Sequence, residues 1–199
     1  MVTAGDIVRL DALAVRASVQ VVSQARVADL GRPTPCEAWT LAELLAHMTA
    51  QHNGFAAAAA GDGADFVRWQ TGAPAADPVQ EYCAAAARVV AAFGAPGVLD
   101  RDFTLPEISP QPRFPAEQAI GFHLVDYVVH GWDVARALGL RCDLGPALLA
   151  AALPIARSVP DGQNRRRPGA SFAPRVAVSR GSTLDHIVAL LGRRPGWPV

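Results

Sequence analysis

Apolar residues recur every three to four positions along most of the chain, which is the spacing of amphipathic α-helices. The first stretch of this kind spans residues 6–27. Further helices are predicted at 41–59, 78–93, 115–139, 146–159 and 182–192. Alanine runs within the sequence favour helix over sheet. The pattern therefore predicts an all-α protein in which four main helices form a bundle, with irregular crossovers and a short C-terminal helix.

Capping residues mark several of the predicted helix ends. Thr40 and Glu43 form a capping box, in which each side chain satisfies an exposed backbone N–H of the other residue. Asp77 is placed as an N-cap before Pro78, and proline is favoured at the first helical position. Pro154 removes a backbone donor inside the 146–159 stretch, so we expect that helix to be kinked or broken.

The segments between the helices are rich in proline, glycine and polar residues. Residues 61–76 are predicted to be a connection, and residues 98–105 an extended segment. Residues 106–115 contain too many prolines for a regular element. The long loop at 160–181 includes three consecutive arginines at 165–167, which a solvated loop explains better than a site for an anionic group.

Composition and charge exclude several classes of function. A chain of 199 residues suits one domain, 1–199, which buries roughly 70% of its unfolded surface. The formal net charge is zero, so we expect neither nucleic acid nor a membrane as a partner. All basic residues are arginine, and the absence of lysine excludes Schiff-base chemistry and a P-loop lysine.

The cysteines and the N-terminal stretch favour a cytoplasmic location. Cys36, Cys83 and Cys142 are widely spaced and form no C-x-x-C pair, so we expect them to be reduced. Residues 1–22 lack a basic region followed by an apolar one, which a signal peptide requires. No apolar stretch is long enough to span a bilayer.

One face of the 115–139 helix carries residues typical of metal sites. Asp126 and His130 are four residues apart, so both side chains lie on one face and can hold one cation. His47, on an earlier helix, can complete the set. Two imidazoles and one carboxylate leave a fourth tetrahedral position open, as in a catalytic zinc site. The alternative is a solvated Asp–His pair on a surface helix.

The other histidines have more than one interpretation. His123 precedes Asp126 by one turn and could be a further ligand, a pocket acid or base, or a hydrogen-bond partner of Asp126. We favour a pocket role, with His123 as the catalytic polar group. His52 is turned about 140° from His47 around an ideal helix, so we expect it at the surface or rim. His186 is expected to be exposed.

Several other conspicuous residues have structural explanations. Asp133 and Arg136 are three apart on one helix and are expected to form an ion pair. Trp132 is expected in the core, and burial explains Cys36 better than a reactive thiol does. The sequence contains no G-x-S-x-G elbow and no G-x-G-x-x-G loop, so serine-hydrolase and dinucleotide-binding functions have no support.

Three parts of the sequence resemble a known family. They are Pro33–Leu41 (PTPCEAWTL) with Leu44–His47 (LLAH), His130–Ala137 (HGWDVARA) and Leu190–Pro195 (LLGRRP). These segments resemble the mycothiol-dependent maleylpyruvate isomerase-like branch of the DinB-like superfamily. The resemblance covers most of the chain, and its two histidine motifs are fairly specific.

The resemblance implies an up-down-down-up four-helix bundle with a divalent metal, often zinc, at one end of the core. The family's ligands fall on His47, Asp126 and His130, with glutamate frequent where Asp126 stands. Thiol-dependent relatives place the sulfur of a low-molecular-weight thiol at the open metal position. The characterised isomerase type carries an additional C-terminal domain for which this chain is too short, so we do not expect maleylpyruvate itself as the substrate.

The resulting hypothesis is a metal-dependent enzyme that uses a low-molecular-weight thiol such as mycothiol. It would transfer sulfur to a small electrophilic substrate or isomerise that substrate. One alternative is a thiol-independent biosynthetic enzyme with the metal as a Lewis acid. Another is a non-catalytic bundle that binds a metal or a small ligand. A homodimer is one assembly that we consider.

Overall fold

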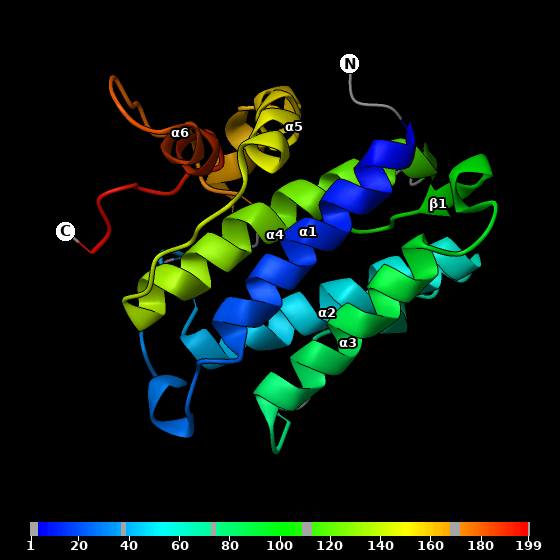
Figure 1. The fold of residues 1–199 in the computed structure, drawn as a ribbon, viewed down its shortest axis with the longest axis horizontal. Helices are drawn as coiled ribbons and strands as arrows, with labels where there is room; N and C mark the ends of the chain where they lie inside the picture. The colour runs from blue at the N-terminus through cyan, green and yellow to red at the C-terminus, as the bar shows by residue number, and fades with distance from the viewer. Residues whose placement is uncertain (1–3, 37–38, 73–74, 109–112, 168–171, 199) are drawn as a thin grey trace.

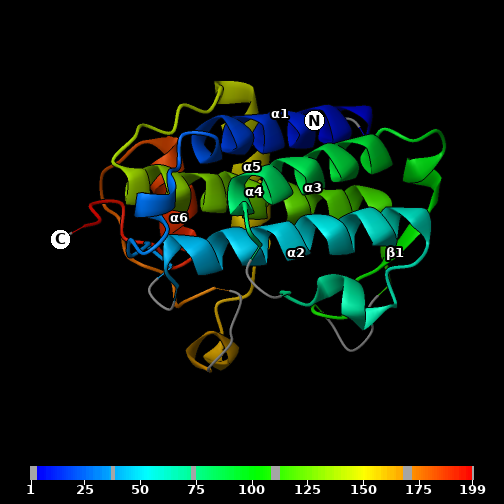
Figure 2. The same cartoon turned by 90° about the horizontal axis from the view of Figure 1, so that it is seen from below.

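The protein is a helical bundle in a computed structural model that describes residues 4–36, 39–72, 75–108, 113–167 and 172–198. The bundle helices are α1 (Ala4–Val22), α2 (Leu41–Ala60), α3 (Pro78–Phe93) and α4 (Ala116–Leu138). Helices α1 and α4 run in one direction and α2 and α3 in the opposite one (Figure 1). Figure 2 shows the four helices side by side, with α1 packed on α4 and α2 on α3. This arrangement confirms the predicted all-α bundle.

Local capping explains why the predicted helix starts agree with the structure. At the start of α2, the Thr40 backbone N–H donates to Glu43 Oε2 at 2.8 Å, and the Thr40 side chain accepts from the Glu43 backbone. At the start of α3, the Asp77 side chain accepts from the backbone N–H of Gln80 at 2.9 Å. Gly61 ends α2 at a φ of 101°, a left-handed conformation that glycine adopts without steric cost.

Several predicted elements have different bounds in the structure. Helix α1 ends at Val22 and is followed by the short 3-10 helix η1 (Val27–Asp29), so it does not reach residue 27. Helix α5 (Pro146–Ser158) continues through Pro154, because buried side chains along it pack onto the bundle and outweigh the lost backbone bond. Of the expected kink or break at this proline, the break is therefore wrong.

A small hairpin closes one end of the bundle. Strand β1 (Asp102–Thr104) pairs antiparallel with β2 (Arg113–Pro115), so part of the proline-rich 106–115 segment is regular, contrary to expectation. Residues 109–112 of that segment lie outside the described residues. Pro115 is tolerated because it is the last residue of an edge strand, where its missing donor costs little.

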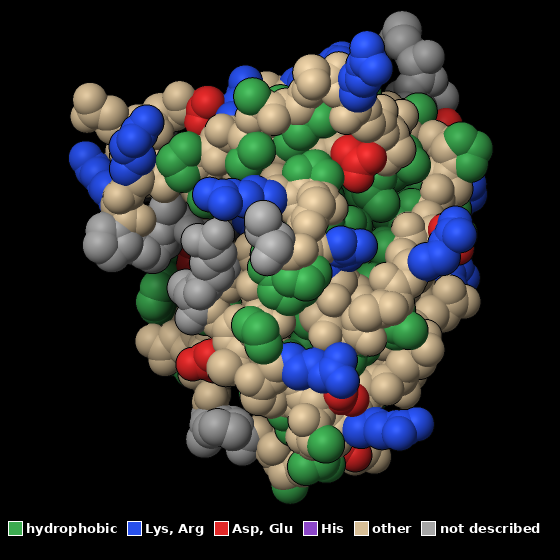
Figure 3. Space-filling view, turned by 90° about the vertical axis from the view of Figure 1, so that its left-hand side faces the viewer, with side chains coloured by type: hydrophobic (Ala, Val, Ile, Leu, Met, Phe, Trp, Pro, Cys, Tyr) green, Lys and Arg blue, Asp and Glu red, His purple; other side chains and the backbone are tan. Residues whose placement is uncertain are grey.

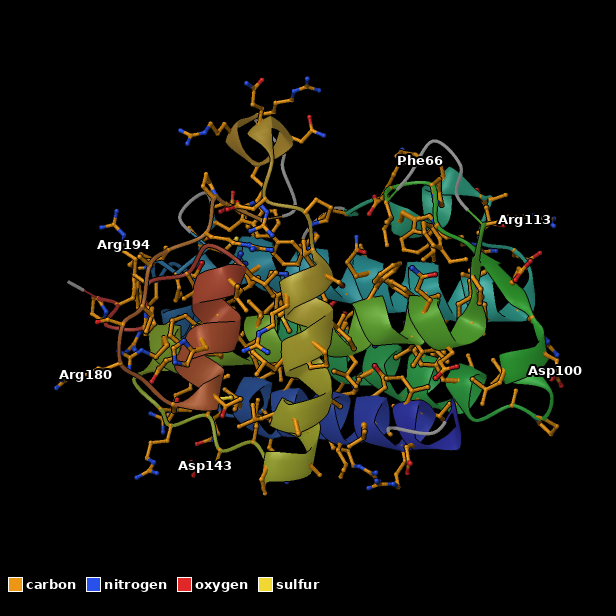
Figure 4. The ribbon with its side chains drawn as sticks, turned by 90° about the horizontal axis from the view of Figure 1, so that it is seen from above. Phe66, Asp100, Arg113, Asp143, Arg180 and Arg194 are labelled. Carbon is orange, nitrogen blue, oxygen red and sulfur yellow. The ribbon has the colours of Figure 1, made fainter. Side chains whose placement is uncertain are left out.

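The C-terminal third packs across the bundle. Figure 4 shows α5 crossing α4 and α1, with the short helix α6 (Thr183–Leu190) beside it. Short 3-10 helices lie at η2 (Phe66–Trp69), η3 (Val98–Asp100) and η4 (Gln163–Arg166). Arg165 is only 7% exposed and donates to backbone carbonyls of Pro160 and Leu190, each at 2.7 Å. It is thus a structural residue and not part of a solvated loop.

Helix α4 is the most buried element of the bundle. Most of its described side chains are shielded from solvent, including Trp132, which confirms that residue as part of the core. Among the described residues, no helix is long and apolar enough to cross a membrane. Figure 3 shows arginine and acidic side chains interspersed with apolar ones on one face, so charge of one sign does not dominate that face.

Candidate metal centre

Three predicted residues meet between α2 and α4. His47 lies in the second turn of α2, and Asp126 and His130 lie one turn apart on α4. One ligand atom from each lies within 4.8 Å of the others, so the three can contact a single cation. They are the one such group of histidine, cysteine or acidic side chains in the described parts of the chain. We call His47, Asp126 and His130 the metal cluster.

The metal cluster is partly shielded from solvent. His130 is 2% exposed, the Asp126 side chain is 19% exposed, and His47 is also only partly buried. Burial, and then the neighbouring His130, lower the pKa of His47 to about 4. His47 is therefore neutral near pH 7, and a neutral imidazole is the form that coordinates a metal.

A carboxylate behind the metal cluster fixes the orientation of His130. Its Nδ1–H donates to Asp133 Oδ2 at 3.0 Å, while Nε2 lies 3.5 Å from Asp126 Oδ1. The bond at Nδ1 leaves the lone pair on Nε2, directed into the metal cluster. Metal-binding histidines commonly have this outer carboxylate, which fixes the tautomer and raises the basicity of the ligand.

Asp133 is paired with an arginine from the C-terminal segment. Arg193 Nη2 lies 3.0 Å from Asp133 Oδ2, and both residues are almost fully buried. Burial raises the pKa of Asp133, but Arg193 and His130 outweigh this effect and hold it below its usual value. Asp133 is therefore a carboxylate that can accept the His130 hydrogen bond.

The expected ion pair between Asp133 and Arg136 is wrong. Asp133 faces Arg193 and His130, whereas Arg136 donates from Nε to the backbone carbonyl of Trp197 at 2.9 Å. Spacing along one helix did not decide the pairing because α4 is covered on several sides. Each side chain reaches a partner from the C-terminal segment.

An aromatic ring covers one side of the metal cluster. The Trp39 ring centroid lies 4.5 Å from that of His47 and 6.4 Å from that of His130. Cys36, three residues earlier, is half-buried and lies outside the metal cluster.

His123 lies in a separate, fully buried hydrogen-bond chain. Its Nδ1 is 2.7 Å from Asp11 Oδ1, and its Nε2 is 3.1 Å from His52 Nδ1. We call Asp11, His123 and His52 the buried chain. All three residues are at most 1% exposed. The structure does not bring His123 into the metal cluster. The catalytic role of this residue remains a prediction.

The surface position expected for His52 is wrong. Its side chain is 0% exposed and its ring stacks on Tyr127, with centroids 3.9 Å apart. Helix α2 is packed against α3 on one side and α4 on another, so a residue turned away from His47 still faces protein. His186, also expected at the surface, is half-buried on α6.

A cavity between three helices is separate from the metal cluster. It has a volume of about 360 Å³ and lies between α1, α4 and α5, where Gly121, Phe122 and Ile155 line it. Neither His123 nor any residue of the metal cluster is part of the lining. The cavity therefore does not supply the pocket that the sequence led us to expect around His123.

The sequence did not indicate the roles of four residues, two within the buried chain and two beside the metal cluster. Asp11 had a detectable signal, because it is a charge four residues after Ile7 on the apolar face of the first helix. His52 was assigned to the wrong environment, and Asp133 to the wrong partner. Arg193 had no local signal, since its partner lies 60 residues away.

Comparisons with known proteins establish the family. The family model of the mycothiol maleylpyruvate isomerase N-terminal domain matches residues 12–135, which include all three residues of the metal cluster. Two uncharacterized proteins of Mycobacterium tuberculosis, from strains CDC 1551 / Oshkosh and ATCC 25618 / H37Rv, are each 32% identical over 179 residues. These matches cover 87% of this chain and 90% of each relative. The chain therefore belongs to the mycothiol maleylpyruvate isomerase N-terminal domain family.

A solved structure shares the fold. The crystal structure of the mycothiol-dependent maleylpyruvate isomerase matches with a TM-score of 0.62 and 14% identity, over 93% of this chain and 87% of that chain. The DinB-like bundle predicted from the sequence is thus confirmed. The match covers 87% of that chain. This protein is therefore not too short to correspond to most of the solved isomerase, contrary to expectation.

Proposed function

We propose that this protein is a cytoplasmic enzyme that uses a low-molecular-weight thiol at a divalent metal, with zinc the expected ion. His47, Asp126 and His130 would hold the metal. The observation that carries the proposal is the convergence of their ligand atoms within 4.8 Å, with His130 already oriented by Asp133. Family membership supports the link to mycothiol.

The donor set fits a catalytic zinc ion. Two imidazoles and one carboxylate provide three ligands of the kinds that zinc prefers and leave a fourth position open. A bound zinc ion would lower the pKa of a coordinating thiol and so supply a thiolate near neutral pH. The fit therefore rests on the side chains present and not only on the family.

Each residue of the metal cluster has a distinct task in this proposal. His130 presents Nε2 because Asp133 occupies its Nδ1–H, and His47 stays uncharged because of burial. Asp126 supplies the negative charge that offsets a cation. Trp39 covers the His47 ring and excludes water from that side.

The reaction class that follows is addition of the thiol sulfur to an activated, electron-poor double bond. A new C–S bond forms while the π electrons move onto the conjugated carbonyl group of the substrate. Rotation about the resulting single bond, followed by loss of the thiol, returns an isomer and consumes no thiol. If the adduct instead takes up a proton, the product is a thioether and the reaction is sulfur transfer.

Metal content is the first test of this proposal. Wild-type protein, His47→Ala and a His186→Ala control should be dialysed against metal-free buffer, reconstituted with zinc and analysed for bound metal. We expect near-stoichiometric zinc in the wild type and the control. The His47→Ala protein should lose it while keeping its helical circular dichroism, because His47 supplies one of three ligands. Equal zinc in all three proteins would show that the ligand assignment is wrong.

Thiol dependence is the second test. Zinc-loaded protein should be assayed with maleylpyruvate and with other electrophilic alkenes, with and without mycothiol. Turnover that requires the thiol supports the proposal. Turnover without thiol would replace it with Lewis-acid catalysis, and metal binding without turnover on any electrophile tested would favour a metal-binding bundle.

A further inference from the structure

Two buried residues outside the metal cluster connect it to the C-terminal segment. Asp133 is 0% exposed on α4, and Arg193 is 3% exposed just after α6. Arg193 lies beyond the 12–135 region that matches the family model. The C-terminal segment therefore contacts the proposed metal site through one side chain.

We propose that Asp133 and Arg193 are positioning residues for the metal centre, and that metal binding and docking of the C-terminal segment stabilise each other. The inference rests on the proposed function only in requiring that the metal cluster binds a divalent cation. It does not depend on which thiol or which substrate is used.

The His130 ring must be held in one orientation and one tautomer before it can bind a metal. An imidazole can rotate and can carry its proton on either nitrogen, and only the form with a lone pair on Nε2 can serve the metal cluster. The 3.0 Å bond from Nδ1–H to Asp133 Oδ2 selects that form and that ring orientation. Outer carboxylates of this kind typically contribute tenfold to 100-fold in metal affinity.

The buried Asp133 carboxylate in turn needs a charge partner. A buried carboxylate is costly unless it is paired and hydrogen-bonded. Arg193 supplies this pairing through Nε, at 3.2 Å and 3.3 Å from the two oxygens, and through Nη2 at 3.0 Å. Without the guanidinium group, the carboxylate would be buried without its charge partner, and its position opposite His130 would no longer be fixed.

The C-terminal segment fixes the position of Arg193. Arg193 also donates from Nη1 to the Leu191 carbonyl at 2.9 Å, which fixes the guanidinium group relative to its own backbone. Gly192 has a φ of 84° and lies against the Ala173 backbone, where an added Cβ would be 2.5 Å from the Ala173 carbonyl oxygen. The segment thus holds Arg193 in one place only while it is docked. If docking of the segment strengthens metal binding through His130, metal binding must stabilise the docked segment by the same free energy.

Zinc affinity is the measurement that tests the proposal. Wild-type protein, Asp133→Asn, Arg193→Lys and Arg141→Gln should be titrated with zinc in a competition assay against a chelator. Arg141→Gln is the matched control, because the Arg141 side chain is 89% exposed and pairs with Asp143, not with Asp133. We expect Asp133→Asn to bind zinc about 10–100-fold more weakly, with unchanged stoichiometry. Arg193→Lys should bind with intermediate affinity and the control within a few-fold of wild type.

Hydrogen exchange of residues 183–198 tests the coupling. Zinc should slow exchange in this segment in the wild type and in Arg141→Gln, and should slow it much less in Arg193→Lys. If Asp133→Asn fails to fold, Arg193→Lys carries both tests, because it keeps the buried positive charge.

The outcomes separate this proposal from the proposed function. Wild-type affinity in both Asp133→Asn and Arg193→Lys would overturn the positioning role while leaving the metal site intact. Exchange that zinc does not alter in the wild type would overturn the coupling. A wild-type protein that binds no zinc would overturn both the positioning role and the metal-dependent function.

Discussion

Two sets of one carboxylate and two imidazoles share helix α4, and they differ in how their atoms are arranged. In the metal cluster, one atom from each of His47, Asp126 and His130 lies within 4.8 Å of the others. In the buried chain, the atoms lie in sequence, from Asp11 through both nitrogens of His123 to His52. The same kinds of side chain therefore direct their atoms toward one position in the metal cluster, whereas in the buried chain they form a linear series of hydrogen bonds.

The arrangement decides which ion each set can hold. Both nitrogens of His123 already have hydrogen-bond partners, so this residue has no lone pair free for a metal. The atoms of the metal cluster converge, and the outer nitrogen of His130 is occupied by Asp133. Convergent atoms suit a cation, whereas a linear chain suits protons shared between neighbours.

The two sets also differ in their contact with solvent. The Asp126 side chain is 19% exposed, whereas Asp11, His123 and His52 are at most 1% exposed. Burial raises the pKa of Asp11 and holds the pKa of His52 well below its usual value. Within the described residues, Asp11 Oδ2 and His52 Nε2 have no hydrogen-bond partner. The carboxylate of the buried chain therefore carries a desolvation cost that the partly exposed Asp126 carboxylate of the metal cluster does not carry to the same extent.

Replacement of His123 should have the largest effect on stability. In His123→Ala, Asp11 loses its partner in the core, and breaking a buried pair costs about 3–5 kcal/mol. Bound zinc should remain stoichiometric, because His123 is not a member of the metal cluster. Urea unfolding and metal analysis of the same protein check both expectations.

This result would also decide whether His123 acts in catalysis. If His123→Ala keeps wild-type stability and loses turnover, the difference drawn between the two sets is wrong and the predicted catalytic role is correct. His123→Phe serves as the control for ring volume, since it fills the space between Phe55 and Phe93 without a polar atom.

Protonation should reveal the buried chain in the pH dependence of stability. In the unfolded chain His52 takes up a proton near pH 6.5, but burial lowers its pKa in the folded protein. The folded state therefore binds fewer protons, and stability is lost as the pH falls below about 6.5. His52→Phe lacks this contribution. Between pH 6 and pH 5, the wild type should lose about 1.4 kcal/mol more than His52→Phe does.

Denaturant titrations at several pH values provide this measurement, in metal-free buffer. His186→Gln is the control, because His186 is half-buried and belongs to neither set. Parallel pH profiles for the wild type and His52→Phe would mean that His52 is protonated equally in the folded and unfolded states.

Local signals made much of the fold predictable from the sequence. The bounds of α2, α3 and α4 follow from capping residues and apolar spacing, which act within a few positions. Asp126 and His130 could be paired for the same reason, because one helical turn relates them. His47 was linked to them by residue type and by the family resemblance, and it comes from a separate helix.

Packing between distant elements decided what the sequence could not show. His52 is buried because α3 and α4 cover α2 on different sides, and a single-helix projection does not include those neighbours. Asp133 pairs with Arg193 across 60 residues, although Arg136 is the nearer basic residue in sequence. Local spacing therefore paired Asp126 with His130 but did not indicate Asp133 and Arg193, the residues that support them.

A conservative change within the metal cluster should have the smallest effect. Asp126→Glu keeps the carboxylate and adds one methylene at a position whose side chain is already partly exposed, so the longer chain has room to adjust. We expect stoichiometric zinc, with an affinity within about tenfold of wild type, or 1.4 kcal/mol. Chelator competition against the wild type measures the difference.

The analogous change in the buried chain, Asp11→Glu, adds a methylene at a position where the side chain is fully buried and should destabilise the fold by about 1–3 kcal/mol. Equal tolerance of the two changes would mean that exposure does not distinguish the metal cluster from the buried chain.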